Sequence, residues 1–156
     1  MRLAAHGLAL ELPRGWDGRL YRRAGGDPTL HAANFPLPAM DGDFGSGATA
    51  MMPAHSAFLA LKEYRPASRL VAGVGLFASR SIPLPLERGW FHPRALQVGR
   101  AGQAGFQHFF TASGRPFCLY AVIEVAATSS ASVTRALDRL DELSRILSTL
   151  AIGSPA

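Results

Sequence analysis

Cysteine is scarce in this chain, because Cys118 is the only one among 156 residues. A single thiol excludes an internal disulfide and gives no reason to place the protein in an oxidising compartment. Charged residues are also few, at 17%, whereas hydrophobic residues make up 48%. This composition is too apolar for an intrinsically disordered chain, so we expect a folded protein.

Long hydrophobic runs are missing as well. No uncharged stretch reaches the roughly 20 residues that a membrane-spanning helix needs. Glu11 and Pro13 interrupt the start of the chain before the apolar core of a secretory signal develops. We therefore expect a cytoplasmic location and no membrane partner. The length is typical of one domain, and residues 1–156 are assigned to a single unit.

Basic residues outnumber acidic ones, and the formal charge is +5. The densest basic stretch alternates with aromatic residues, in the order Arg14, Trp16, Arg19, Tyr21, Arg22 and Arg23. Such a face can bind single-stranded nucleic acid through phosphate contacts and base stacking, which is one alternative for the function. The remaining arginines are scattered, which disfavours a nucleic-acid partner and favours a solvated strand face.

Strand patterns dominate the first half of the sequence. Leucines at every second position from Leu8 to Leu12 predict a strand with one buried side, which Pro13 ends. Residues 19–23 predict a second strand, paired with the first as a hairpin around a loop that carries Trp16. Residues 29–35 predict a third strand, and the prolines and glycines that follow predict a long loop over 36–50.

The middle of the chain is less regular. After a turn at Pro53, residues 58–64 favour a strand, although a helix over 53–64 remains open. Residues 68–80 are small and apolar and suggest a short helix. Two prolines in residues 82–86 predict an extended edge or loop segment, because proline cannot donate to a sheet ladder.

The clearest strand pairing lies over residues 105–111 and 116–125, which flank a short turn at Gly114. The second strand is apolar on both faces, so we expect it to be central and covered on both sides. An amphipathic helix begins at about Ser132, with oxygens at 128–130 available to cap it. Its predicted apolar stripe comprises Val133, Leu137, Leu140, Leu143 or Ser144, and Leu147.

The two ends of the chain carry a family resemblance. The opening His6-Gly-Leu-Ala-Leu-Glu-Leu-Pro-Arg-Gly-Trp16 resembles the start of PsbP-like and Mog-type Ran-binding proteins, and the helix over 136–147 with the apolar tail 150–152 is similar to their end. The resemblance implies an α+β fold, with an antiparallel sheet of about six to seven strands flanked by helices and a C-terminal amphipathic helix packed on the sheet. It also implies action by binding rather than by catalysis.

Catalytic and metal motifs are weak. Cys118 and His108 lie on the two strands of the predicted hairpin, and a thiol-dependent hydrolase or transferase is a second alternative if the register puts both on one face. Asp41-Gly-Asp-Phe-Gly45 lacks the context of a kinase or calcium loop and is interpreted as a polar turn. His31, His55 and His92 are isolated in the sequence, so we assign no catalytic residue, metal or cofactor.

Apolar residues in irregular segments supply the leading functional hypothesis. They are Phe44, Met51, Met52, Trp90 and Phe91. Methionine and aromatic side chains in loops can form an adaptable surface for a peptide or helix. The sequence therefore predicts a non-enzymatic binding or adaptor module for a protein or peptide partner, and it leaves open whether the module is a homodimer.

Overall fold

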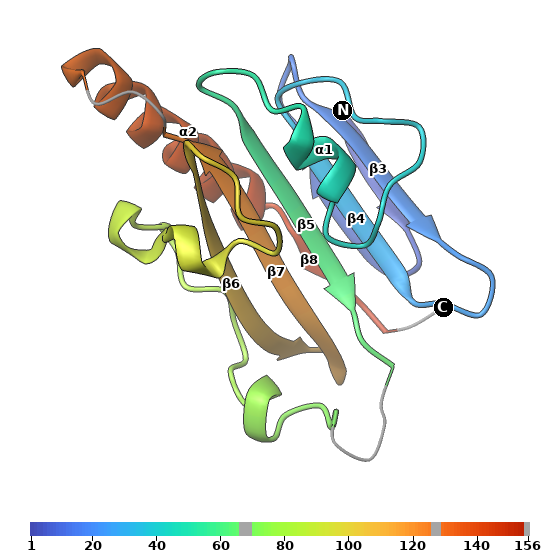
Figure 1. Cartoon of the computed structure of the whole chain (residues 1–156). Coiled ribbons are helices and arrows are strands. Elements are labelled where there is room, and N and C mark those ends of the chain that lie inside the picture. Colours follow the sequence, from blue (N-terminus) through green and yellow to red (C-terminus); the bar gives the residue numbers. More distant parts are fainter. Residues whose placement is uncertain (66–69, 126–128, 155–156) are drawn as a thin grey trace.

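The computed structural model describes residues 1–65, 70–125 and 129–154. Within these ranges the chain has an α+β fold with eight strands in two antiparallel sheets and one long helix near the C-terminus (Figure 1). None of the helices in these ranges is long and apolar enough to cross a bilayer.

The larger sheet has the strand order β3-β4-β5-β7-β6. Its members are β3 (Asp17–Arg22), β4 (Pro28–Ala33), β5 (Ala57–Glu63), β6 (Gln103–Ala112) and β7 (Arg115–Glu124). The smaller sheet, in the order β1-β2-β8, contains β1 (Arg2–Ala5), β2 (Leu8–Glu11) and β8 (Ala151–Ile152). The helices are α1 (Ser46–Ala50) and α2 (Ser130–Ser148), and the 3-10 turns are η1 (Gly75–Phe77), η2 (Arg88–Trp90) and η3 (Pro93–Ala95).

The five-stranded sheet is covered on both faces, with α2 and α1 on opposite sides (Figure 1). We call the side packed against α2 and the small sheet the helix face, and the side packed against α1 and residues 34–52 the loop face. The core of the helix face includes Leu8, Leu10, Leu61, Leu119, Leu140 and Leu143. The smaller core of the loop face includes Phe35, Ala48, Phe58, Tyr120 and Val122.

Strand β7 confirms the prediction of a central strand covered on both sides. Its neighbouring residues alternate between the two cores, so that Leu119 enters the helix face and Tyr120 the loop face. The predicted hairpin is also confirmed, since β6 and β7 pair in register from Ala112 and Arg115 outward. The turn between them contains Ser113 and Gly114, both with positive φ.

The predicted hairpin between residues 8–12 and 19–23 is wrong. β2 pairs with β1 and β8, whereas β3 pairs with β4. Strand β1 was not predicted; it turns back into β2 at His6 and Gly7, which have φ values of 54° and 76°. Because β2 completes its pairing within the small sheet, the predicted single sheet of six to seven strands is divided into two.

Helix α2 confirms the C-terminal helix, but its predicted apolar stripe is buried only in part. Ser129 caps the helix by accepting a hydrogen bond from the Ser132 N–H; Thr128 lies outside the described residues. Leu140, Leu143, Ile146 and Leu147 are buried. Val133 and Leu137 are 54% and 48% exposed, because the first turns of α2 project beyond the strands that cover the rest of the helix (Figure 1).

The remaining predictions of secondary structure have mixed outcomes. Strands over 29–35 and 58–64 are confirmed as β4 and β5, and residues 82–86 are irregular as expected. The loop predicted over 36–50 contains the short helix α1. In the segment 68–80, η1 is the helical turn among residues 70–80; residues 68 and 69 lie outside the described ranges.

Candidate functional site

A pocket of about 450 Å³ opens on the loop face beside the edge strand β3. We call it the β3 pocket. Its lining residues are Arg19, Leu20, Tyr21, Arg23, His31, Pro38, Ala39, Met40 and Asp41. They come from β3, β4 and the loop that leads to α1, so the pocket lies between the sheet and the segment that covers it.

The pleat of the strands determines which side chains meet in the β3 pocket. Arg19 is paired across strands with His31, and Tyr21 follows two residues later on the same face of β3. His31 is in turn paired with Ala60 of β5 and faces the Phe58 ring of the loop-face core. Alternation in β3 and β4 therefore places the His31 imidazole next to the Arg19 guanidinium and the Tyr21 phenol on the same face of the sheet.

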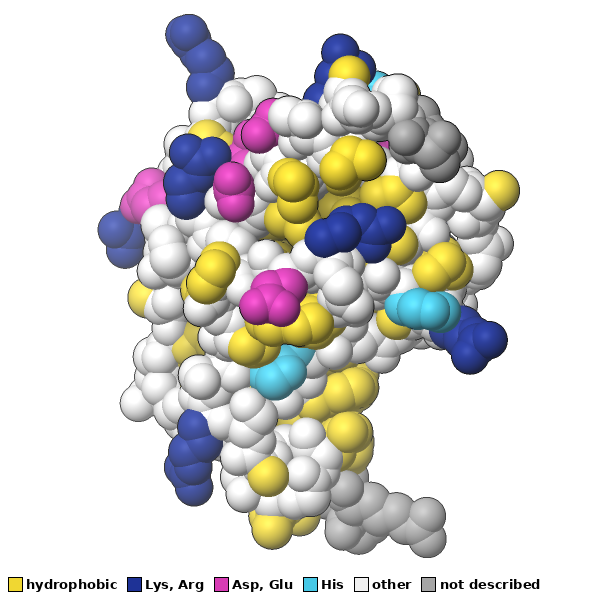
Figure 2. Space-filling model, turned by 90° about the vertical axis from the view of Figure 1, so that its left-hand side faces the viewer, with side chains coloured by type: hydrophobic (Ala, Val, Ile, Leu, Met, Phe, Trp, Pro, Cys, Tyr) yellow, Lys and Arg dark blue, Asp and Glu magenta, His cyan; other side chains and the backbone are white. Residues whose placement is uncertain are grey.

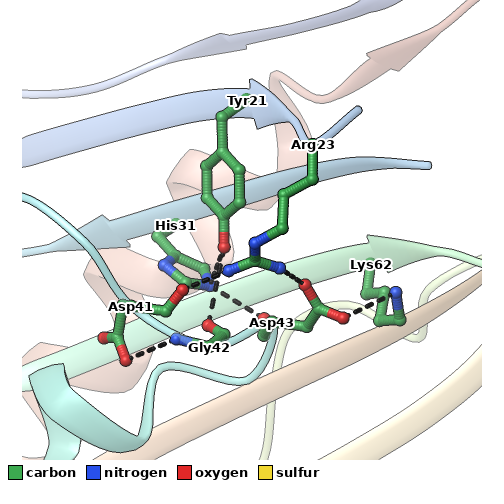
Figure 3. A network of polar contacts seen from close by, with 7 residues as sticks. All are labelled: Tyr21, Arg23, His31, Asp41, Gly42, Asp43 and Lys62. Atoms are coloured by element: carbon green, nitrogen blue, oxygen red, sulfur yellow. Dashed lines mark hydrogen bonds and ion pairs between the residues drawn. The ribbon is translucent and has the colours of Figure 1, made fainter. Parts of the chain in front are cut away.

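Asp43 fixes this arrangement from the loop (Figure 3). Its carboxylate forms ion pairs with Arg23 and with Lys62, the latter at 2.9 Å from Oδ2 to Nζ. Its backbone oxygen accepts a hydrogen bond of 2.8 Å from His31 Nε2. Burial raises the pKa of the Asp43 carboxyl, but Lys62 and Arg23 outweigh this effect, so the pKa lies below its usual value. Asp43 is therefore ionised at neutral pH.

His31 is the buried base of the site. Its ring contacts Tyr21 and Phe58 in edge-on geometry, each with ring centres 5.3 Å apart. Burial lowers the pKa of His31 below its ordinary value of 6.5, which keeps the ring neutral at pH 7. Because the Asp43 backbone oxygen can only accept, the proton of the neutral ring is on Nε2.

Two hydrogen-bond donors of the pocket are poorly used. The Tyr21 hydroxyl lies 3.4 Å from His31 Nε2 and 3.5 Å from the Gly42 carbonyl oxygen. The Arg19 guanidinium reaches the Leu37 carbonyl oxygen at 3.4 Å. All three contacts are longer than ordinary hydrogen bonds of these types. Burial raises the pKa of Tyr21, so its hydroxyl keeps its proton and remains a donor.

Asp41 has a structural role that agrees with its interpretation as part of a polar turn. Its two carboxylate oxygens accept hydrogen bonds from the backbone N–H groups of Gly42, Gly47 and Ala48, each at 2.8 Å. The carboxylate thus satisfies free N–H groups at the start of α1. Across the described ranges, no three His, Cys, Asp or Glu side chains are grouped so as to hold a metal ion.

A second concavity, of about 410 Å³, lies between β2 and the C-terminal half of α2. Its acidic groups already have partners. Glu142 accepts a hydrogen bond from the Trp16 indole and pairs with Arg139, and Glu11 pairs with Arg2. The acidic side chains of this concavity are thus engaged by residues outside its lining, and the β3 pocket is the better candidate site.

The loop residues predicted to bind a partner do not form one surface. Phe44 and Met52 pack against the loop-face core, where the Phe44 ring meets Tyr120 edge-on at 5.8 Å. Met51 is exposed beside them. Trp90 and Phe91 belong to the opposite, helix face.

Within that second group, Phe91 is 3% exposed and belongs to the core. Trp90 is half-buried and stacks on Phe106 with ring centres 5.6 Å apart. The predicted five residues are thus split between two faces of one sheet.

Figure 2 shows the side of the molecule that lies at the left in Figure 1. There some hydrophobic side chains gather around a hollow crossed by a cationic side chain, and others are scattered among charged groups.

The hairpin register separates Cys118 from His108. Cys118 is paired with Phe109, whereas His108 is paired with Leu119, so their side chains point to opposite faces. Burial raises the pKa of Cys118 to about 12, which leaves almost no thiolate at neutral pH. His108 Nε2 lies 2.8 Å from the Ser81 carbonyl oxygen. This geometry does not support a nucleophile and base formed by the two residues.

The arginine and aromatic stretch is also divided. Trp16 is buried in the helix-face core, and its indole N–H donates to Glu142. Arg22 lies on the face of β3 opposite Arg19 and Tyr21. The side chains of Arg19, Tyr21 and Arg23 remain together, and these line the β3 pocket.

The sequence analysis did not identify the β3 pocket, although one signal was present. Alternation in residues 19–23 puts Arg19, Tyr21 and Arg23 on one side, but the partners His31 and Asp43 are brought in by strand pairing and loop folding. Compared with protein-family models, curated proteins and solved structures, the chain matches none.

Proposed function

We propose that this protein is a non-enzymatic binding module that takes a segment of a protein or peptide partner into the β3 pocket. The observation that carries the proposal is a pocket whose donors lack good acceptors although its supporting residues are firmly held. A site of about 450 Å³ falls within the usual range for ligand pockets.

The lining combines features of recognition sites. Pro38, Ala39 and Met40 form an apolar wall opposite the polar side chains of β3. Met40 is 90% exposed at this wall, and a flexible thioether there can adapt to different ligand shapes. The polar side is rigid by comparison, because Arg23 is tied to Asp43 and to the backbone oxygen of Asp41.

The chemistry of the lining favours binding over turnover. The lining contains a phenol, an imidazole, two guanidinium groups and the Asp41 carboxylate, whose oxygens accept from backbone N–H groups, but it includes no serine, threonine or cysteine. The Nε2 atom of His31 faces a backbone oxygen, so this proton is committed to holding the loop. These residues can orient a ligand without supplying an activated nucleophile.

A selection from a displayed peptide library tests the proposed function. We expect the wild-type protein to enrich a common peptide pattern and the Ala39→Trp variant to lose it, because the indole fills the pocket. Ala131→Trp is the matched control, since Ala131 is exposed on α2. The proposal fails if no peptide pattern is enriched, or if enriched peptides bind A39W as tightly as they bind A131W.

The relation to PsbP-like and Mog-type proteins also remains a proposal. Three features support it: the α+β architecture, the antiparallel arrangement of the large sheet and the C-terminal helix laid across one face. Members of that group act by binding, which agrees with the function proposed here. A further likeness is the Gly15-Trp16 turn after β2, where Gly15 has a φ of 88°.

A further inference from the structure

We infer that the group recognised by the β3 pocket is a single carboxylate, as carried by an acidic residue of a peptide, and that Arg19 and Tyr21 hold it. The inference rests on the proposed function and specifies its ligand. It is argued from the unused donors, from the charge around the pocket and from the shape of the wall.

The first argument is the contrast between two arginines. Arg115 is buried and makes four hydrogen bonds of 2.6 to 2.9 Å, two to Glu63 and two to backbone oxygens. Arg19, by contrast, makes one contact of 3.4 Å to the Leu37 oxygen among the described residues. A guanidinium has five N–H donors, so Arg19 has most of its donors free for a ligand.

The Tyr21 hydroxyl extends this set of donors. Because His31 Nε2 carries the ring proton, the acceptor of this hydroxyl among the described residues is the Gly42 carbonyl oxygen at 3.5 Å, whereas an O–H donor to a carboxylate oxygen prefers about 2.5–2.7 Å. Tyr21 and Arg19 stand two residues apart on the same face of β3. A carboxylate between them would receive two charge-assisted hydrogen bonds from a strand that is already in place.

The charge around the pocket indicates a ligand with one negative charge. The charged groups that line it, or that pair with the lining, are Arg19, Arg23, Lys62, Asp41 and Asp43. Three cations against two carboxylates leave one positive charge, and the Asp41 oxygens are occupied by the N–H groups of α1. Asp17 is outside this count because it does not line the pocket and no ion pair joins it to a cation among the described residues; its carboxylate accepts from the N–H groups of Gly18 and Leu37. A carboxylate neutralises the remaining charge, whereas a dianionic phosphate exceeds it.

The wall of the pocket completes the fit. Pro38, Ala39 and Met40 contribute apolar atoms from the loop before α1, whereas Arg19 and Tyr21 come from β3. The methylene groups of a glutamate side chain can pack on this wall while the carboxylate faces the strand. The pocket therefore suits a short aliphatic stem that ends in a carboxylate.

An NMR titration with blocked amino acids tests this inference directly. The probes are N-acetyl-glutamate-N-methylamide, its glutamine analogue and the phosphoserine analogue, with binding followed at the backbone amides of β3. We expect the glutamate probe to bind at least about tenfold more tightly than the glutamine probe, because the glutamine amide provides no charge-assisted acceptor. The phosphoserine probe should bind no more tightly than the glutamate probe.

Variants on the two faces of β3 provide the matched comparison. Arg19→Gln and Tyr21→Phe should each weaken the glutamate probe by about tenfold or more. Arg22→Gln removes the same charge from the opposite face of the strand and should change binding by less than about twofold, since that exposed charge is screened. Amide spectra that remain dispersed show that each variant is folded.

The outcomes separate the two proposals. Equal binding of the glutamate and glutamine probes, or equal losses in R19Q and R22Q, overturns the carboxylate inference. Tighter binding of the phosphoserine probe than of the glutamate probe overturns the inference that the recognised group carries a single negative charge. If peptides selected through the pocket carry no acidic residue, the binding function stands and this inference is wrong. If A39W leaves peptide binding intact, the proposed function itself fails.

Discussion

At the scale of single residues, Asp43 anchors the loop that leads to α1 on the large sheet. Its carboxylate holds Arg23 and Lys62, and its backbone oxygen holds His31. The imidazole is thereby fixed in one tautomer inside the sheet. A buried histidine in this position makes the folded state sensitive to acid, because protonation introduces a charge where burial opposes it.

His31 gives a prediction for the pH dependence of stability. Its pKa in the folded protein lies below the ordinary 6.5 because of burial, so the unfolded chain takes up the proton at a higher pH than the folded chain does. The contribution to the free energy of unfolding is complete above about pH 6.5 and decreases as the pH falls below that value.

Urea denaturation between about pH 7 and pH 5 measures this effect. We expect the wild-type protein to lose stability across this interval and the His31→Gln variant to show a smaller decrease, because glutamine keeps an N–H donor but does not titrate. If the free energy of unfolding of H31Q depends on pH as strongly as that of the wild-type protein, other groups cause the acid sensitivity.

At the scale of elements, the two halves of α2 differ in what they contribute. The C-terminal half places Leu143 and its neighbours in the helix-face core, whereas Leu137 in the first half is 48% exposed. A fully buried leucine contributes roughly 1.5–3 kcal/mol through burial alone. The position of the helix relative to the strands, rather than its sequence pattern, determines which leucines are buried.

Leucine-to-alanine substitutions in α2 test this division. We expect Leu143→Ala to lower the free energy of unfolding by about 2–5 kcal/mol, because it removes core contacts and leaves a cavity. Leu137→Ala removes the same atoms from an exposed position and should change it by about 0.5 kcal/mol or less. Equal effects of the two substitutions would contradict the placement of α2 in the structure.

Most elements could be predicted from local patterns, but their partners could not. The period of two in residues 8–12 and the turn at Gly114 identified a strand and a hairpin, because those signals lie within a few residues. The hairpin of β2 with β1 is local and was overlooked at the turn of His6 and Gly7, whereas the pairing of β2 with β8 depends on residues at the two ends of the chain. His31 looked isolated for the same reason, since Tyr21, Asp43 and Phe58 reach it only through the tertiary fold.

At the scale of the whole molecule, Arg115 joins the two sheets. It forms a bidentate ion pair with Glu63 of β5, and its other N–H groups donate to the backbone oxygens of His6 and Gly153. Those oxygens belong to the β1–β2 turn and to the end of β8. One side chain of the large sheet thus holds the end of the small sheet where the β1–β2 turn lies beside the end of β8.

Removal of this side chain should destabilise the entire protein. We expect Arg115→Gln to lower the free energy of unfolding by about 3–5 kcal/mol, because Glu63 is left as a buried charge without its partner. The control is Arg65→Gln, which breaks an exposed pair with Asp27 and should cost at most about 1 kcal/mol.

Chemical denaturation followed by tryptophan fluorescence and by circular dichroism measures both variants. The two signals should change together in R115Q, since Trp16 and the strands share the helix-face core. Separate transitions in the wild-type protein would show that the sheets unfold independently, and equal losses of stability in R115Q and R65Q would show that Arg115 does not join them energetically.

The outer wall of the β3 pocket has a consequence for how such a protein can change its specificity. Leu37 is anchored by its N–H to Asp17, and Asp41 is anchored at the start of α1, so residues 38–40 span the gap between two fixed points. Ala39 and Met40 are exposed and lie outside both hydrophobic cores. On the function proposed here, this tripeptide is therefore exchangeable: new sequences there would bind other ligands while the sheets beneath it keep their stability.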